Sequence, residues 1–217
     1  MRKKINKPKV PKQLENFIYT KNSIEDGELK IKNYAIEKQE ITNLEDVRIQ
    51  LDVAYFKGVT FENISFKDAD CMDVVFEKCI FIRCDFSGAG LHRIVFSDCK
   101  CVGLQFSDAF LSHVHFIGGV LELVSFSFAK IRNIQFENIT CRQTDFFTVD
   151  WKDASFTEVR MQSADFTGTN LGAIDFTKTE LEAVQISVDL VKGCRVNEQQ
   201  ALAFAAILGL DIQEPIE

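Results

Sequence analysis

A bulky apolar residue recurs at every fifth position through most of this chain. The stretch ADFTGTNLGAIDFTKTELEAV, residues 164–184, shows the period as the units ADFTG, TNLGA, IDFTK and TELEA. In steps of five from Phe56 to Ile186 the position is filled 27 consecutive times, 15 of them by Phe. An α-helix repeats every 3.6 residues and a strand every two, so this period predicts neither a helix nor a flat strand.

A second series of inward positions lies two residues before each bulky one and holds small or short side chains. It begins with Ala54, Val59, Ile64, Ala69 and Val74. The remaining three positions of each unit are mostly polar or charged. Two of every five side chains are therefore predicted to point inward. A fixed-period array of units that cannot bury their own apolar side indicates a solenoid.

The spacing of Phe indicates how many five-residue sides make one coil. Four sides would stack one all-Phe column, and Phe66 through Phe166 would form the column opposite. The first column would hold Phe56, Phe76, Phe96, Phe116, Phe136, Phe156 and Phe176. Three sides would instead mix large and small residues in every column, so we predict four.

The units ADFTG, TNLGA, CDFSG and AGLHR follow the pattern A-(D/N)-(L/F)-x-x, and over about residues 50–190 the chain resembles the pentapeptide-repeat family. The resemblance implies an all-β fold, a right-handed quadrilateral β-helix whose core is formed by the two inward series. We divide the chain into an N-terminal tail and cap (1–50), the β-helix (51–196) and a C-terminal helix and tail (197–217). The basic start, MRKKINKPKVPK, is expected to be a solvated tail, and residues 13–50 a cap on the first coil.

The period of five ends at VNEQQALAFAAILGL, which predicts a short α-helix. Asn197 is a good N-cap, Gln200 stands at the capping-box position, and Gly209 supplies the stop. The helix is apolar almost all round, and capping the last coil buries only one side. A second copy of the chain would cover the rest, as the resemblance to the Qnr and MfpA-like branch also implies. The expected homodimer residues are Leu202, Phe204, Ala205, Ile207 and Leu208. The alternative is a monomer with a deeply inserted helix.

All seven cysteines fall on inward positions, and no CxxC spacing occurs: Cys71, Cys79, Cys84, Cys99, Cys101, Cys141 and Cys194. Such a set is typical of reduced thiols used as small apolar residues in a cytoplasmic protein. Cys79 and Cys99 would stack one coil apart, which leaves a disulfide between them as the alternative. No apolar run approaches the length that crosses a bilayer, so we expect no transmembrane helix and no membrane partner.

The residues suited to catalysis do not form a recognisable site. His92, His113 and His115 occupy outward positions and are interpreted as surface histidines. The glycines at 87–90 and 118–119 obey the period of five and precede no helix, so they do not form a phosphate loop. We therefore expect no catalytic, cofactor-binding or metal-binding residues, and a protein that is not an enzyme.

Charge is distributed unevenly along the chain. Residues 1–50 carry 11 basic and 8 acidic residues, whereas residues 143–217 carry 5 basic and 13 acidic ones. We predict that the acidic residues of the repeat form a partner-binding surface. They are Asp85, Asp145, Asp150, Asp153, Glu158, Asp165 and Asp175, of which Asp85, Asp145 and Asp165 should share one outward column. The negative sign disfavours direct binding of nucleic acid.

Qnr-type and MfpA-type proteins bind DNA gyrase and topoisomerase IV by resembling duplex DNA, and they protect these enzymes from quinolones. The resemblance therefore implies the same partners for this chain. The alternative is a protein-interaction scaffold with an unrelated partner. It is favoured by a predicted outward apolar patch of Ile80, Ile82, Val102, Val120 and Leu123.

Overall fold

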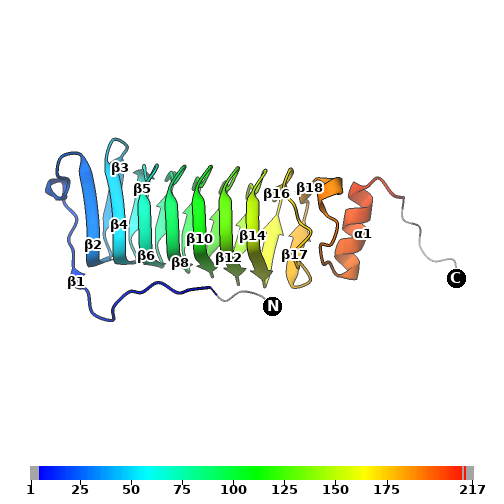
Figure 1. Cartoon of the computed structure of the whole chain (residues 1–217), viewed down its shortest axis with the longest axis horizontal. Helices are drawn as coiled ribbons and strands as arrows, with labels where there is room; N and C mark the ends of the chain where they lie inside the picture. The colour runs from blue at the N-terminus through cyan, green and yellow to red at the C-terminus, as the bar shows by residue number, and fades with distance from the viewer. Residues whose placement is uncertain (1–4, 212, 214–217) are drawn as a thin grey trace.

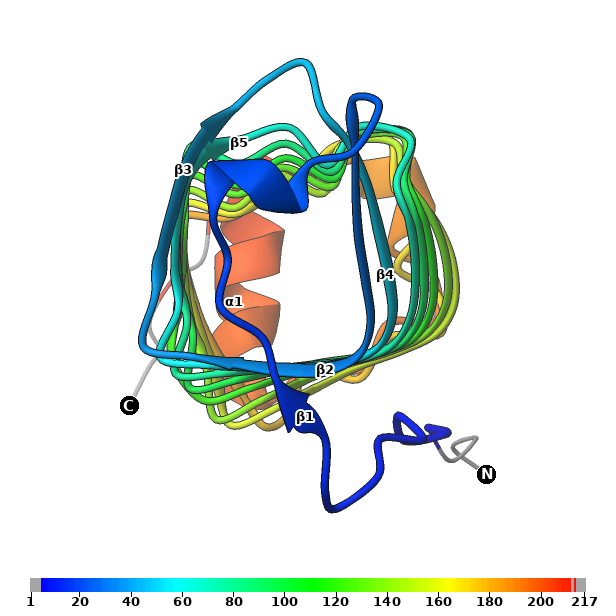
Figure 2. The same cartoon turned by 90° about the vertical axis from the view of Figure 1, so that its left-hand side faces the viewer.

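The chain forms a straight rod in which the backbone coils around a central apolar core (Figure 1). The computed structural model describes residues 5–211 and 213. The coil makes about nine turns and ends at a helix. Seen from its N-terminal end, it runs clockwise as it recedes, so the β-helix is right-handed, with four sides to each turn (Figure 2). The fold predicted from the period of five is confirmed.

Two eight-stranded parallel sheets and one two-stranded sheet make up the coil. The first sheet holds β1 (Glu15–Asn16), β2 (Glu28–Glu37), β4 (Arg48–Lys57), β6 (Asp70–Glu77), β8 (Gly90–Ser97), β10 (Phe110–Ile117), β12 (Lys130–Glu137) and β14 (Asp150–Thr157). The second holds β3 (Glu40–Leu44), β5 (Thr60–Ile64), β7 (Ile80–Ile82), β9 (Lys100–Val102), β11 (Val120–Glu122), β13 (Thr140–Arg142), β15 (Val159–Gln162) and β17 (Thr179–Glu182). Strands β16 (Asp165–Phe166) and β18 (Gln185–Ile186) form the third. Two 3₁₀ turns, Lys21–Ser23 and Val188–Leu190, complete the elements outside the helix α1 (Glu198–Ile207).

Strands pair in parallel with a constant offset of four repeat units, so four sides make one coil. Phe116 pairs with Phe136, and Phe136 with Phe156. We number the sides 1 to 4 after the bulky residues of one coil, which are Cys71, Phe76, Phe81 and Phe86. Side 1 and side 2 lie on the long strands of the first sheet, side 3 lies on the second sheet, and side 4 is joined by single bridges.

The predicted Phe columns fill the core. On side 2 the rings from Phe56 to Phe176 are stacked, and Phe136 lies 5.2 Å from Phe116 and 5.0 Å from Phe156 between ring centroids. On side 4 the rings from Phe66 to Phe166 stack in the same way, with 5.1 Å between Phe126 and Phe146. Offset stacking at this distance is favourable for aromatic pairs. Both columns that the spacing predicted are confirmed.

The corners of the coil explain the polar residues that follow each bulky one. The second residue after the bulky position commonly has a positive φ, as at Asp68 (54°), Asp73 (55°) and Lys78 (54°). This left-handed conformation turns the chain from one side to the next, and it favours Asp, Asn and Gly over larger residues. Gly119 is the tightest position, because a Cβ there would lie 2.0 Å from the carbonyl oxygen of Cys99.

Residues 1–50 differ from the expected tail and cap. Strands β2 and β3 join the two sheets in register, so the coil begins at Glu28 rather than at residue 51. The physical reason is that Ile31, Ile36 and Ile41 continue the bulky series and are buried. Residues 1–4 of the expected basic tail lie outside the described part of the chain.

Residues 5–14, which we call the strap, do not form the solvated tail that we expected. They run along the outside of the first sheet, from β10 back to β2 (Figure 1). The backbone N–H of Lys9 donates to Asp73 Oδ1 at 2.8 Å, and that of Asn6 donates to His113 Nδ1 at 3.2 Å. Ile5 is buried. The strap therefore gains both hydrogen bonds and apolar burial from the coil.

The C-terminal end is less regular than the middle. The first sheet ends at β14, and Leu181, Val184 and Ile186 are only partly buried. Six of the seven cysteines predicted to point inward are buried, and Cys194 packs against the core but is only half-buried, because the last coil has no further coil stacked on it. The predicted cap of α1 is present, since the Asn197 side chain accepts from the Gln200 N–H at 2.9 Å.

Candidate partner-binding surfaces

Three of the predicted acidic residues form one column on side 4. Single parallel bridges connect Asp85 to Gln105, Ser125 to Asp145, and Asp145 to Asp165. Asp145 and Asp165 are therefore direct neighbours, whereas Asp85 lies three coils from Asp145. We call Asp85, Asp145 and Asp165 the acidic column.

The carboxylates of the acidic column also stabilise their own turns. Each accepts a hydrogen bond from the backbone N–H two residues further on, at 2.8 Å for Asp85, 2.7 Å for Asp145 and 2.8 Å for Asp165. Burial opposes ionisation of Asp85, but hydrogen bonds from Ser87 and the Lys67 ammonium outweigh it and lower the pKa of Asp85. One oxygen of each side chain thus serves its own turn, and Asp145 Oδ2 also accepts from the hydroxyl groups of Ser125, at 3.0 Å, and Ser127.

The other four acidic residues lie apart from this column. Asp150 is paired with Arg132 at 2.7 Å, and that hydrogen bond lowers the pKa of Asp150. Asp153 and Asp175 line a notch of about 920 Å³ beside Trp151, together with Lys152 and Arg195. Glu158 is exposed at a different corner, after the bulky residue of side 2. The seven residues therefore divide among several surfaces.

Helix α1 closes the coil with a small part of its surface. Phe204 is 9 % exposed and faces the last coil, and Ala205 is half-buried. Gln200 is buried, and its Nε2 donates to the carbonyl oxygens of Phe176 at 2.9 Å and Thr179 at 2.5 Å. The helix therefore lies on the end of the rod rather than deep within it (Figure 1).

The remaining apolar side chains of this end are exposed. Of the residues expected at a dimer interface, Leu202, Ile207 and Leu208 are between 42 % and 49 % exposed. Leu210, which the helix pattern did not include because it follows the stop at Gly209, is 60 % exposed. The end of the rod thus carries a cluster of bare leucine and isoleucine side chains.

The outward apolar residues predicted to cluster do lie together on side 3. In the register of strands β7, β9 and β11, Ile82 is beside Val102, and Lys100 separates Ile80 from Val120. Leu123 follows at the next corner and is half exposed. We call Ile80, Ile82, Val102, Val120 and Leu123 the apolar patch.

The three histidines occupy outward positions, as predicted, but each is partly buried, and the strap approaches His113 and His115. His113 accepts a hydrogen bond from the strap at Asn6, and His92 lies edge-on to His113 with 5.9 Å between ring centroids. His115 lines the space beneath the strap and bonds Glu137 at 3.1 Å, and burial lowers its pKa. No period marks the strap in the sequence, although Pro8 and Pro11 favour an extended backbone.

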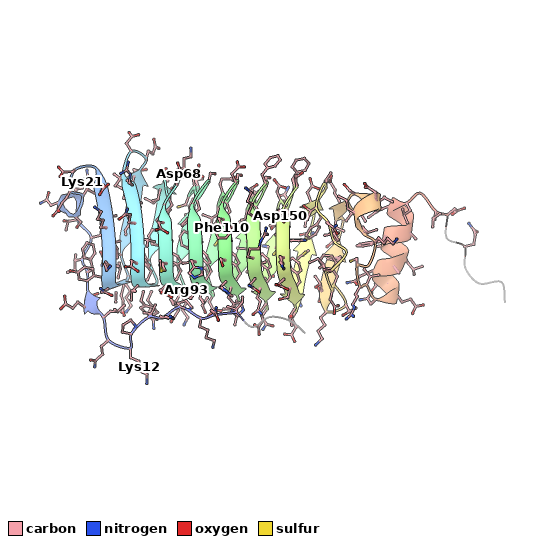
Figure 3. All side chains as sticks on the ribbon, in the orientation of Figure 1. Lys12, Lys21, Asp68, Arg93, Phe110 and Asp150 are labelled. Carbon is pink, nitrogen blue, oxygen red and sulfur yellow. The ribbon has the colours of Figure 1, made fainter. Side chains whose placement is uncertain are left out.

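The strap is fixed at its centre by a buried ion pair. Asp73 and Arg93 make two hydrogen bonds of 2.6 Å, and Asp73 also accepts the N–H of Lys9 (Figure 3). The hydrogen bond from Arg93 lowers the pKa of Asp73. Figure 3 shows Lys12 pointing away from the coil, so the basic side chains of the strap reach solvent while its backbone is bonded.

Within the part of the chain that the structure describes, no three His, Cys, Asp or Glu side chains are grouped to hold a metal ion. No helix among those residues has the length and apolar character needed to cross a membrane. The seven thiols are free, including Cys79 and Cys99.

Comparison with known proteins agrees with this geometry. A model of the pentapeptide repeat region matches residues 69–146 and 89–166. No curated protein matches. Among solved structures, QnrB1, described as a plasmid-mediated fluoroquinolone resistance protein, is similar with a TM-score of 0.52 and 18 % identity, covering 85 % of this chain and 96 % of its own.

A second solved structure is HetL, a pentapeptide repeat protein involved in heterocyst differentiation regulation from the cyanobacterium Nostoc sp. strain PCC 7120. It matches with a TM-score of 0.29 and 12 % identity, over 76 % of this chain and 86 % of its own. The fold itself is a β-helix of stacked five-residue units, and residues 69–166 of it match the pentapeptide repeat region.

Proposed function

We propose that this chain is a non-enzymatic, cytoplasmic DNA mimic that binds DNA gyrase or topoisomerase IV and protects them from fluoroquinolones. The observation that carries the proposal is the uninterrupted rod. Within the described residues the coil continues from Glu28 to Arg195, and its strands stay in register from each coil to the next. Support comes also from the similarity to QnrB1, whose description names fluoroquinolone resistance.

One rod has the length of a short segment of duplex DNA but carries much less negative charge. About nine turns at roughly 4.8 Å give a length of about 43 Å. B-DNA of that length carries about 25 negative charges, at one per roughly 1.7 Å. Residues 28–195, which form these turns, hold 25 acidic and 18 basic residues, which is a net charge of −7. Shape and a local concentration of charge must therefore supply most of the likeness.

A homodimer through the C-terminal end would supply that concentration. Leu202, Ile207 and Leu208 are bare there, and a second copy would cover them. Residues 143–217 carry 13 acidic and 5 basic residues, a net charge of −8, so two copies joined end to end would place about twice that charge near the centre of the longer rod. Asp145, Asp165 and Asp175 belong to this region.

The test of function is a gyrase supercoiling assay with a fluoroquinolone, with and without the purified chain. Protection is expected at micromolar protein. Neither protection nor inhibition at that concentration would contradict the proposal for gyrase, and the same assay with topoisomerase IV decides between the two enzymes.

The test of the dimer uses charged substitutions on the bare side chains. Ile207→Glu with Leu208→Glu should yield a monomer by light scattering, whereas Gln199→Glu, on the exposed first turn of α1, should not. Phe204 is unsuitable because it faces the coil. A folded monomer that still protects gyrase as well as the parent would separate dimerisation from function.

The contribution of charge is tested in the intact dimer. Replacing Asp145, Asp165 and Asp175 by Asn keeps an oxygen acceptor for each turn and removes three negative charges. Binding should weaken, and the loss should shrink as salt screens the interaction. An equal loss at low and high salt would point to a structural effect.

A scaffold with an unrelated protein partner is the second candidate, and the apolar patch favours it. Polar substitution there, such as Ile82→Thr with Val102→Thr, should leave gyrase protection unchanged if the first proposal is right.

A further inference from the structure

Three phenylalanines break the rule that places this residue in the core. Of the 20 Phe in the chain, 15 fill the bulky inward series, and within the coil only Phe110, Phe128 and Phe147 do not. They fall in the segments 107–110, 127–130 and 147–150, which form the same corner, between side 4 and side 1, in three successive coils. We call these three residues the aromatic corner. Figure 3 shows Phe110 near the middle of the rod.

The aromatic corner is exposed in spite of its size. Phe110 is 48 % and Phe128 is 50 % exposed, and the rings of Phe128 and Phe147 meet edge to face with 5.4 Å between centroids. Phe128 and Phe147 thus contact each other at the surface, and Phe110 lies in the coil before them, in register with Lys130. Contiguous exposed aromatic side chains are typical of binding sites.

The backbone at Phe128 also argues against a structural role. Its φ is 60°, in the left-handed region that a bulky residue rarely adopts. The same position in the other coils is held by small or polar residues, namely Asp68, Gly88, Asp108, Thr148 and Gly168. Phe128 is thus unfavourable for the backbone and gains no burial in the core, so the coil itself gives no reason for a phenylalanine here.

The charges around the aromatic corner indicate the chemistry of what binds it. The three segments 103–110, 123–130 and 143–150 contain Asp108, Asp145, Asp150 and Lys130, and because Asp150 is paired with Arg132, Asp108 and Asp145 are the other carboxylates at this corner. Asp145 of the acidic column accepts the backbone N–H of Phe147 at 2.7 Å, so the carboxylate and the ring are adjacent. Negative charge beside apolar rings complements an apolar pocket bordered by Lys or Arg. It opposes an anionic membrane and a second copy of the same corner.

We propose that the aromatic corner is the anchor by which the protein partner is held, its rings entering an apolar pocket whose rim is basic. The inference rests on the proposed function, since the partner tested is the topoisomerase, and it adds a contact that duplex DNA does not offer. The acidic column aligns the rod on the basic surface, and the rings hold it there.

The test compares binding of the full-length chain and a triple variant to the gyrase holoenzyme at two salt concentrations. In Phe110→Asn, Phe128→Asn and Phe147→Ser, each residue takes a small polar type that the turns of the repeat already use, and the net charge is unchanged. Binding should weaken by about 30-fold or more, the loss typical of an aromatic hot spot, and by the same factor at both salts. The matched control is Ile80→Thr with Val120→Thr on the apolar patch, which should bind as the parent does.

Each alternative outcome is distinct. If the triple variant folds and binds like the parent, the aromatic corner is not the anchor and the proposed function stands. If the parent itself binds neither gyrase nor topoisomerase IV, the proposed function is wrong, and a topoisomerase is not the partner of the aromatic corner. If the variant changes the mass seen by light scattering, or only the parent binds vesicles containing phosphatidylserine, then a second copy or a membrane is the occupant and the inference is wrong. The single variant Phe110→Asn repeats the test should the triple variant not fold.

Discussion

The two ends of the rod are closed in different ways. At the N-terminal end Leu29 and Ile31 are each 2 % exposed, because Phe17, Tyr19 and Ile24 pack against the first coil. At the C-terminal end Leu181, Val184 and Ile186 are only partly buried beneath α1. The chain thus seals its first coil with its own residues and leaves its last coil partly open.

The difference shows where such a rod has room for a second molecule. Each coil contacts only the coil before it and the coil after it, so every interior coil is covered twice and an end coil once. The N-terminal segment supplies the missing neighbour for the first coil. Helix α1 supplies it for the last coil mainly through Phe204 and Gln200, and its large apolar residues Leu202, Ile207 and Leu208 remain exposed. The C-terminal end is therefore the end suited to pairing.

A substitution in the middle of the rod gives the reference loss of stability against which the two ends can be compared. Phe136→Ala should lower the free energy of unfolding by about 3–5 kcal/mol, since the ring is buried between Phe116 and Phe156. Urea denaturation measures the change. Phe128→Ala is the control with the same change of residue at the surface, and it should cost less than about 0.5 kcal/mol. Equal losses at the two positions would contradict the assignment of inward and outward sides.

The same substitution at the two ends then compares their closure. Leu29→Ala should cost about 2–4 kcal/mol because that side chain is fully buried, whereas Leu181→Ala should cost about 1 kcal/mol. Both are read from urea denaturation at a dilution where the chain is monomeric. A larger loss at Leu181 would mean that the C-terminal end is the better sealed of the two.

Gln200 carries the polar part of the C-terminal closure. Gln200→Ala removes the side-chain donor to the Thr179 carbonyl, one of the two donors to the Phe176 carbonyl, and half of the capping box, so about 1–3 kcal/mol should be lost. The neighbouring exposed residue, in Gln199→Ala, is the control and should have almost no effect. Hydrogen exchange should quicken along β17 in the first variant. Unchanged exchange there would show that α1 closes the end without this side chain.

Thiol labelling gives the smallest and most local measure of the open end. Cys194 is half-buried and the other six cysteines are buried, so Cys194 should be modified first. Burial raises the pKa of the Cys194 thiol to about 11, and the thiolate fraction below that pH grows tenfold with each pH unit. Its labelling by iodoacetamide, followed by mass spectrometry, should therefore speed up about tenfold from pH 7 to 8 and again to 9. Cys194→Ser should abolish the fast phase, and equally fast labelling of Cys71 would contradict it.

Most of the coil could be predicted because its five-residue period can be recognised from residues that are close together in the sequence. The bulky and small series specify which side chains point inward, and the spacing of Phe specifies four sides, so the columns ending at Phe166 and Phe176 follow directly. The helix cap at Asn197 and Gln200 could also be predicted from the sequence, since it depends on two residues three positions apart.

The contacts outside the period could not be predicted. The strap forms hydrogen bonds with Asp73 and His113, and the bonded residues are 64 and 107 positions apart in the sequence. No sequence pattern within the strap predicts these partners. The same limit applies to the acidic residues. The period placed Asp85, Asp145 and Asp165 in one column, but it does not say that Asp150 is bonded to Arg132. A prediction from spacing assumes that every outward side chain is exposed to solvent. It therefore misses the contacts of outward residues with the strap and the ion pairs between them.

The strap has a consequence for the order in which the protein is made. Its residues are translated before the side chains that hold it, Asp73 and His113, which follow up to 107 residues later. At typical rates of about 5–20 residues per second, Asn6 waits about 5 to 20 s for its acceptor. During that interval the nascent coils grow with the outer surface of their first sheet uncovered, and the strap docks only after the coils that it crosses have formed.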